Sequence, residues 1–323
     1  MDVRRFRGVG PAAVTPMRAD GSLDLDGYAA HLEFLIEGGV HFLVPCGTTG
    51  ESATMTPDEQ RKVIEKAVEV ADGRVPVMAG AGTNDTREAG MLARAAREVG
   101  ADAVLSVTPY YNQPPQEGLY RHYMSVADSA EVPVFVYNVP GRTSGNIAPD
   151  TLFRLAEQHE LIVGVKEASG DMQQVMTILR DRSPGFIVLS GEDHLTFAMV
   201  ALGGEGVISV VANQVPAAMS EMVEAALAAD YVTARKLHYR LLPLMRMNFV
   251  ETNPIPVKTG LEMMGRFPAH FRLPLCELSE RNREPLREAL ELAGVPLPQG
   301  DASRREDVQV DAEGEALAAR MTP

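Results

Sequence analysis

The sequence predicts an α/β fold, a TIM (β/α)8 barrel with a C-terminal helical extension. Short apolar runs of strand length alternate with longer stretches of helical period along the first two thirds of the chain. Polar residues follow these runs, where a parallel barrel opens its active site. From about residue 216 the pattern becomes mainly helical. We therefore expect a barrel over residues 1–215, a helical extension over 216–298 and a disordered tail over 299–323.

The expected strands share a buried, β-branched character and a helical stretch after each of them. They cover residues 9–15, 40–46, 75–81, 103–108, 132–138, 161–167, 186–190 and 206–211. Eight βα repeats of this length are the signature of the barrel. The rival fold is a doubly wound open sheet, which a glycine fingerprint after the first strand would favour, and residues 15–17 offer none.

Helix starts are visible between the runs. Thr56 fits an N-cap with Pro57 at the first helical position and Glu59 three residues on, the pattern of a capping box. Asp85 and Pro149 open two further helices. In the last third we expect helices over 217–229, 232–249, 257–264 and 279–292.

Composition and residue spacing argue against several classes of function. The net charge of −14 and the lack of a dense Lys/Arg run disfavour nucleic-acid binding. No apolar run reaches the length of a membrane span, and the amino terminus lacks the apolar core of a signal peptide, so we expect a cytoplasmic protein with no membrane partner. Cys46 and Cys276 form no disulfide framework. The seven histidines show no metal-binding spacing, so we expect no metal.

Lys166 ends the sixth apolar run and is the candidate nucleophile. A lysine at the C-terminal end of a barrel strand reaches the active-site face, where its amine can form a Schiff base with a carbonyl substrate. Alternatively, the side chain extends to solvent or pairs with the neighbouring Glu167.

Other polar residues also fall at expected strand ends. Thr48 and Thr49 lie in a glycine-flanked loop that can hold a carboxylate, and Tyr111 follows the fourth strand. Tyr137 lies near the end of the fifth strand, and Arg142 follows it. Taken singly, such a loop is more often a plain turn, each tyrosine more often a packed aromatic, and the arginine more often a surface ion-pair partner. Because all of these strand ends gather at one face, together they indicate an active site.

Five segments resemble a known family. Residues 47–52, 110–112, 137–143, 164–168 and 253–258 are similar to the dihydrodipicolinate synthase family, which belongs to the superfamily of pyruvate-dependent Schiff-base aldolases that also contains N-acetylneuraminate lyase. The resemblance covers roughly residues 5 to 295, in order and without a large gap.

The resemblance implies a carbon-oxygen lyase of class I aldolase type. Lys166 would form a Schiff base with pyruvate, and the enamine would condense with L-aspartate 4-semialdehyde to give 4-hydroxy-tetrahydrodipicolinate, the committed step of diaminopimelate and lysine biosynthesis. The covalent Schiff base would replace any cofactor. Tyr137 would be the acid/base, linked by Thr48 to Tyr111. In the family this second tyrosine comes from an adjacent subunit, and the assembly is a homotetramer built as a dimer of dimers.

Substrate-binding positions also carry over from the resemblance. Thr48 and Thr49 match the family's site for the pyruvate carboxylate, and Gly191 and Ile208 match neighbouring pocket positions. Arg142 matches the residue that holds the carboxylate of aspartate semialdehyde.

A regulatory site follows in the same way. In lysine-inhibited relatives the end product binds at the dimer interface. The matching positions here are Ser52, Ala53, Asn84, Glu88 and Tyr110. Pro57 and Gln60 replace histidines of the enterobacterial type, so we predict weak or absent inhibition by lysine.

Two other functions stay open at this point. One is a pyruvate-dependent aldolase or dehydratase acting on a sugar acid or another aldehyde. Arg142 and the two threonines favour the synthase over this alternative. The other is a non-catalytic barrel that binds a small metabolite or a protein partner. Borohydride trapping with pyruvate separates the second from the enzymes.

Overall fold

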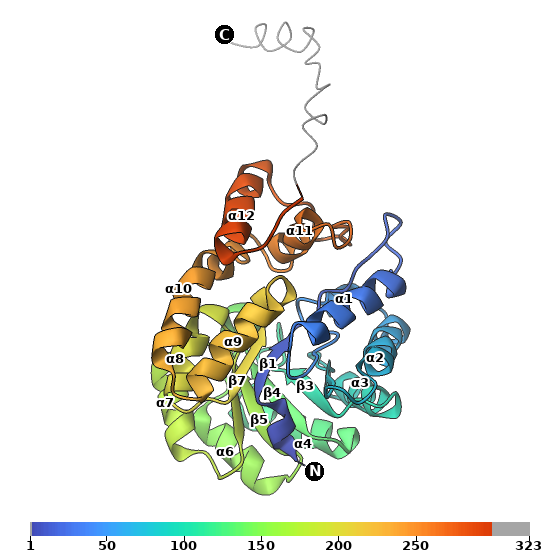
Figure 1. The fold of residues 1–323 in the computed structure, drawn as a ribbon. Helices are drawn as coiled ribbons and strands as arrows, with labels where there is room; N and C mark the ends of the chain where they lie inside the picture. Colours follow the sequence, from blue (N-terminus) through green and yellow to red (C-terminus); the bar gives the residue numbers. More distant parts are fainter. Residues whose placement is uncertain (1, 299–323) are drawn as a thin grey trace, which may run out of the picture.

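The computed structural model describes residues 2–298, and in this part of the chain seven parallel strands form one curled sheet in the order β1-β7-β6-β5-β4-β3-β2 (Figure 1). The strands are β1 (Gly8–Pro11), β2 (Met78–Gly80), β3 (Ala103–Val107), β4 (Val134–Asn138), β5 (Ile162–Glu167), β6 (Ile187–Ser190) and β7 (Gly206–Ser209). Helices alternate with the strands and cover the outside of the sheet, which confirms the predicted TIM barrel.

The helices fall into two sets. Around the sheet lie α1 (Leu25–Glu37), α2 (Pro57–Ala71), α3 (Thr86–Glu98), α4 (Gln116–Ala130), α5 (Pro140–Thr143), α6 (Pro149–Gln158), α7 (Met172–Asp181), α8 (Thr196–Ala201) and α9 (Pro216–Leu227). After them come α10 (Tyr231–Met247), α11 (Ile255–Met263) and α12 (Glu280–Ala293). Short 3-10 helices are η1 (Val3–Phe6), η2 (Ser52–Thr54), η3 (Asp193–Leu195) and η4 (Val211–Asn213).

One expected strand is corrected by the structure. Residues 40–46 form no regular strand, but two isolated parallel bridges, Ala12 with Val44 and Leu43 with Val77, place this segment between β1 and β2. Backbone hydrogen bonds reach it from both sides, at 3.1 Å from the Val44 amide to the Pro11 carbonyl and at 2.8 Å from the Met78 amide to the Leu43 carbonyl. Prolines interrupt the ladder here because each of them lacks an amide donor. The segment therefore fills the eighth position of the barrel with irregular geometry.

The predicted helix starts are confirmed. The Thr56 hydroxyl accepts a hydrogen bond from the Glu59 amide, and the Glu59 carboxylate accepts one from the Thr56 amide at 2.9 Å, which makes α2 begin with a capping box. The Asp85 carboxylate caps α3, and Pro149 is the first residue of α6.

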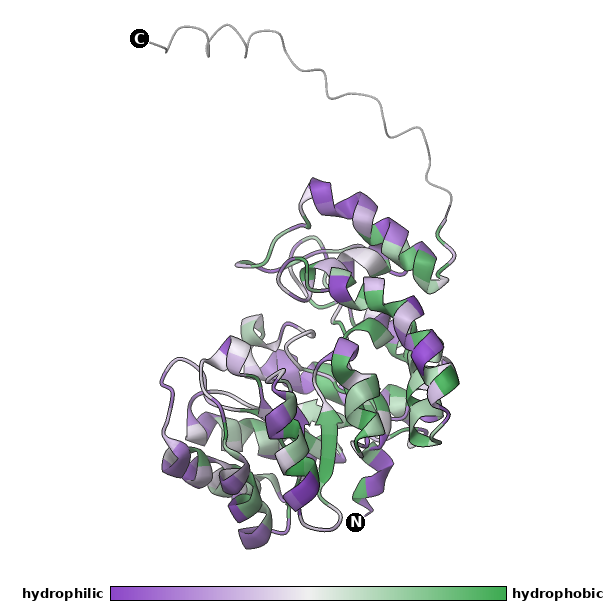
Figure 2. Ribbon diagram, turned by 90° about the vertical axis from the view of Figure 1, so that its left-hand side faces the viewer, coloured by the Kyte–Doolittle hydropathy of each residue, from purple (hydrophilic) through white to green (hydrophobic). Residues whose placement is uncertain are grey.

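The barrel interior is filled by large apolar side chains. Phe6 of η1 closes one end, where its ring packs edge-on against Phe42 and Phe135 with centroids 5.7 and 5.4 Å apart. Ile208 and Tyr137 belong to the same buried cluster. A second buried cluster lies between the strands and the helices outside them. The outward faces of these helices are hydrophilic (Figure 2).

The C-terminal helices share a core with the barrel. Val9 of β1 and Val207 of β7 pack in one cluster with Met219 of α9, Leu241 of α10 and Leu290 of α12. Helix α9 thus covers the barrel strands. The boundary between barrel and helical extension at residue 216 stays an expectation. The expected tail over 299–323 lies outside the described residues. Within the described part, no helix is both long enough and apolar enough to cross a membrane.

Candidate active site

Tyr137 and Lys166 lie side by side at the ends of neighbouring strands. The two residues are partners in the parallel register of β4 and β5, so their side chains point to the same face, into the barrel. Lys166 Nζ lies 4.1 Å from the centroid of the Tyr137 ring. The side chains are 6% and 8% exposed, so the amine is held in a nearly enclosed environment next to a phenol.

Glu167 does not pair with Lys166. Its side chain points to the opposite face of β5, where its carboxylate accepts hydrogen bonds from Asn138 Nδ2 at 3.0 and 3.2 Å, from the Ser169 amide at 2.7 Å and from Gln174 Nε2 at 3.0 Å. Lys166 makes no ion pair with any residue between 2 and 298. The alternative in which Lys166 is a structural partner of Glu167 is therefore wrong.

A cavity opens beside Lys166 and Tyr137. It is also lined by Thr48, Gly47 and Cys46 from the loop that follows the irregular eighth position. Three separate segments thus bring a lysine, a tyrosine and a threonine to one enclosed space, as expected for the active-site end of a barrel.

Thr49 has a different environment from Thr48. Its side chain is 2% exposed, and its hydroxyl accepts a hydrogen bond from Asn253 Nδ2 at 2.9 Å. Thr49 is absent from the residues that line the cavity. Thr48 therefore faces the reaction space, whereas the Thr49 side chain fixes the loop against the segment before α11.

Gly191 lies next to the lysine, and Ile208 belongs to the buried cluster of Tyr137. The Gly191 amide donates to the Glu167 carbonyl at 2.7 Å. A Cβ at Gly191 would lie 2.4 Å from Ala168 Cβ, which excludes a side chain at this position, and 3.1 Å from Lys166 Cε, so glycine also leaves the lysine side chain more room. Ile208 is buried in the barrel interior with Tyr137.

Two acidic residues after β6, Glu192 and Asp193, belong to this region, although the sequence analysis did not single them out as site residues. Asp193 Oδ2 accepts hydrogen bonds from the Val210 and Val211 amides at 3.1 and 2.8 Å. Burial raises the pKa of the Asp193 and Glu192 carboxyls, and the proximity of Lys166 opposes both rises. Both carboxyls therefore interact with the charge of Lys166, and no sequence motif marks them.

Arg142 lies on the short helix α5 with an exposed side chain. Its Nη2 donates to the Asn253 carbonyl at 3.4 Å. Arg142 and Thr48 both line a second cavity, next to the first. The arginine is therefore placed to bind an anion at the outer part of the same site.

Tyr111 does not reach this cavity within the chain. Its side chain is 90% exposed, and its backbone is left-handed with φ of 68°. The proton relay from Tyr137 through Thr48 to Tyr111 stays a prediction, as does the adjacent subunit that it requires.

The residues predicted for lysine binding lie mostly around the second cavity. Ser52, Ala53, Glu88 and Tyr110 line it, whereas Asn84 does not. Thr83 connects the group, because its hydroxyl lies 3.4 Å from the Tyr110 hydroxyl, 3.3 Å from Glu88 Oε2 and 3.4 Å from Asn84 Oδ1. Sequence reasoning missed Thr83.

Metal binding has no visible basis in residues 2–298, where no three His, Cys, Asp or Glu side chains are arranged to hold an ion. The chemistry available at this site is that of an amine, a phenol, hydroxyls and a guanidinium.

Comparisons with known proteins agree on one family. The model of the dihydrodipicolinate synthetase family matches residues 5–293. A 4-hydroxy-tetrahydrodipicolinate synthase of Thermodesulfovibrio yellowstonii is 52% identical over 290 residues, 90% of this chain and 99% of the relative, and the same values hold for one of Methanocaldococcus jannaschii. The crystal structure of dihydrodipicolinate synthase from Aquifex aeolicus is 45% identical, covers 91% of this chain and 100% of its own, and gives a TM-score of 0.89.

Proposed function

The chain belongs to the dihydrodipicolinate synthetase family, and on this basis we propose that it is a 4-hydroxy-tetrahydrodipicolinate synthase, a lyase of the diaminopimelate and lysine pathway. The observation that supports this most is the enclosed, unpaired Lys166 beside Tyr137 and Thr48. The names of the relatives favour this reading over an aldolase or dehydratase for sugar acids.

In the proposed reaction Lys166 forms a covalent intermediate with pyruvate. Its Nζ attacks the ketone carbon, and loss of water gives an imine. The protonated imine withdraws electrons, so a proton leaves the methyl carbon and an enamine forms. This carbon attacks the aldehyde carbon of L-aspartate 4-semialdehyde, and the aldehyde oxygen takes a proton to become the hydroxyl. The substrate amine then attacks the imine carbon and expels the Lys166 amine, which closes the ring.

The other residues have supporting roles in this proposal. Tyr137 exchanges protons with the intermediates, because its phenol lies next to the amine. Thr48, with the backbone around Thr49, Gly191 and Ile208, binds the pyruvate end, and Arg142 binds the semialdehyde carboxylate. The imine itself serves as the electron sink, so no cofactor is needed.

The assembly and its place in the cell are part of the proposal. Tyr111 is too exposed to serve the site of its own chain, which supports a dimer in which it reaches the partner's site. A homotetramer of two such dimers is what the family resemblance implies, and the cytoplasm is the compartment that we propose for it.

The test is a coupled assay with pyruvate, aspartate semialdehyde and a reductase whose NADPH oxidation is followed. Lys166→Ala should abolish turnover and the borohydride-trapped pyruvate adduct, while the surface control Lys66→Ala keeps both. Arg142→Ala should raise the KM for the semialdehyde at least about tenfold and keep the adduct. An adduct without turnover in the wild type would keep the enamine chemistry and reject this aldehyde.

A further inference from the structure

A buried ion pair ties the loop of Thr48 and Thr49 to α11. Lys258 Nζ lies 2.7 Å from Glu51 Oε1, and the two side chains are 0% and 1% exposed. Burial lowers the pKa of Lys258, and the charge of Glu51 opposes this. Removing two charges from water is unfavourable unless they are paired, so the position of Glu51, at the end of the loop, depends on Lys258.

Asn253 makes a second tie at the middle of the loop. Its Nδ2 donates to the Thr49 hydroxyl at 2.9 Å, and both side chains are buried. Its backbone carbonyl accepts from Arg142. The segment before α11 therefore contacts one member of the threonine pair and the arginine proposed for the second substrate.

The loop needs such support because its backbone is unusual. Cys46 and Glu51 flank it, and both are non-glycine residues in the left-handed region, with φ of 56° and 59°. Such conformations persist where the surroundings hold them. The loop is also packed tightly against β2, where a Cβ at Gly80 would lie 2.1 Å from the Cys46 carbonyl oxygen.

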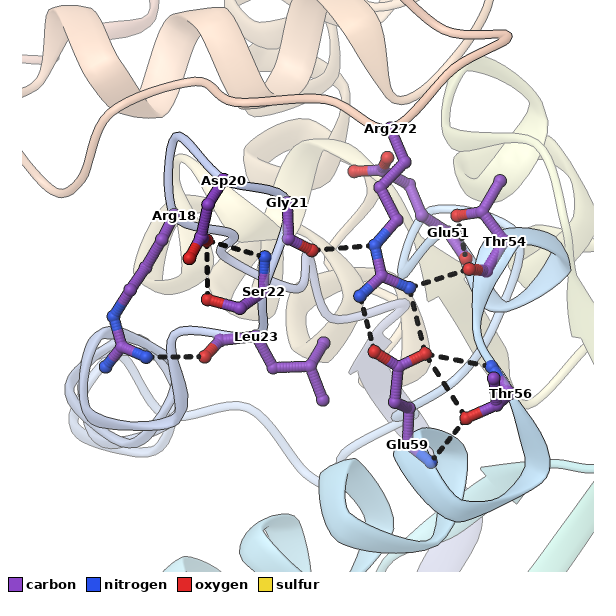
Figure 3. Close-up of polar contacts among 10 residues, drawn as sticks. All are labelled: Arg18, Asp20, Gly21, Ser22, Leu23, Glu51, Thr54, Thr56, Glu59 and Arg272. Atoms are coloured by element: carbon purple, nitrogen blue, oxygen red, sulfur yellow. Dashed lines mark hydrogen bonds and ion pairs between the residues drawn. The ribbon is translucent and has the colours of Figure 1, made fainter.

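Arg272 extends the same support to the residues that follow (Figure 3). From the segment after α11 its Nε donates to the Gly21 carbonyl at 2.8 Å, its Nη1 donates to the Thr54 carbonyl at 2.7 Å, and its guanidinium pairs with both oxygens of Glu59. The guanidinium of Arg272 thus connects three segments: the loop before α1, the 3-10 helix η2 and the start of α2. The C-terminal segment contacts the active-site loop region at three places: Thr49, Glu51 and Thr54.

We propose that Asn253 and Lys258 are positioning residues for the reaction: they hold the turn from Gly47 to Glu51 so that Thr48 and the backbone of Thr49 face the substrate carboxylate beside Lys166. This inference rests on the proposed function. It assigns the C-terminal helical region an indirect role in pyruvate binding, because Asn253 and Lys258 do not line the cavity beside Lys166 and act through the loop that does.

Asn253→Ala is the main test. It leaves the Thr49 hydroxyl without its partner and keeps the carbonyl that Arg142 contacts. Two quantities should rise on the order of tenfold: the KM for pyruvate, and the pyruvate concentration that gives half-maximal borohydride trapping on Lys166, measured by mass spectrometry. The kcat at saturating pyruvate and the KM for the semialdehyde should stay within about twofold, because the reacting groups are unchanged.

A double-mutant cycle identifies the route of the effect. If Asn253 acts through Thr49, the variant Thr49→Val/Asn253→Ala should bind pyruvate as weakly as Thr49→Val alone. The reason is that each of the two changes removes the same hydrogen bond. Additive losses would overturn this route, and a wild-type pyruvate affinity in Asn253→Ala would overturn the positioning role of Asn253.

The ion pair is tested with a pair of variants. Lys258→Met leaves Glu51 buried and unpaired, so it should lower the melting temperature. Glu51→Leu/Lys258→Met removes both charges and should recover the melting temperature without recovering the affinity for pyruvate. Lys66→Met, which breaks an exposed pair with Glu69, is the matched control. A double variant with wild-type pyruvate affinity would overturn the role of Lys258, even if the single variant fails to fold.

The outcome for the wild type separates the proposed function from the positioning role. A wild-type protein that traps no pyruvate contradicts both of them together. A wild type that traps pyruvate, alongside variants that trap it equally well, contradicts the positioning role alone.

Discussion

Lys166 Nζ lies 4.1 Å from the centroid of the Tyr137 ring, and the two residues are register partners on β5 and β4. The contact follows from parallel pairing, because register partners on neighbouring strands present their side chains to the same face. A phenol that lies beside the nucleophilic amine can reach the intermediates formed on it. We therefore expect the Tyr137 hydroxyl to be needed for turnover.

Tyr137→Phe should lower kcat by about 10²- to 10⁴-fold, the usual contribution of a positioned acid or base. The ring and its packing remain, so the melting temperature should change little. The coupled assay measures kcat, and Tyr239→Phe, at a 64% exposed position, is the control. A kcat within a few-fold of the wild type would remove Tyr137 from the mechanism.

Tyr111 should act on the site of a partner subunit. Its side chain is 90% exposed and cannot be assigned to its own cavity. If Tyr111→Phe and Lys166→Ala subunits are mixed and allowed to exchange, mixed dimers should recover activity, because each contains one site with a wild-type lysine and a wild-type tyrosine. A mixture no more active than the sum of its two components would contradict the intersubunit relay.

Lysine should inhibit weakly. Four of the five predicted lysine-site residues line the second cavity. At two positions where the enterobacterial type has histidines, this chain has Pro57, which opens α2, and Gln60, whose Nε2 donates to the Ser52 carbonyl at 3.1 Å. We expect half-inhibition only above roughly 1 mM L-lysine, a binding free energy weaker than about −4 kcal/mol. Gln60→His is the informative variant and should increase the sensitivity. Strong inhibition of the wild type below that concentration would show the prediction to be wrong.

His31 should make the folded state sensitive to acid. Its Nε2 lies 3.0 Å from Asn213 Oδ1, and burial lowers its pKa to about 4. Below the ordinary pKa of about 6.5, the unfolded chain binds a proton that the folded chain does not, so the free energy of unfolding should fall by about 2 kcal/mol between pH 7 and pH 5.

Urea denaturation at the two pH values measures this effect. In His31→Gln the free energy of unfolding should fall much less between pH 7 and pH 5 than in the wild type. In His194→Gln, which changes an exposed histidine, it should fall as much as in the wild type. An equal decrease in the wild type and in His31→Gln would assign the pH dependence to other groups.

Local patterns in the sequence are sufficient to predict the barrel and the core of its site. Apolar runs of strand length predict parallel strands, and the ends of all such strands meet at one face, so the sequence alone predicts that Lys166, Tyr137 and Thr48 lie together. The capping box of Thr56 and Glu59 is predictable from the sequence for a similar reason: its partners are three residues apart.

Only the tertiary structure decided which distant residues support that site. Lys258 and Glu51 are 207 positions apart, and Asn253 and Thr49 are 204 apart, so no propensity or spacing could pair them. The irregular eighth position of the barrel and the separation of Glu167 from Lys166 were likewise settled by packing and by competing hydrogen bonds. Sequence determines which face a residue takes within its own element, whereas a contact between elements depends on how the whole chain packs.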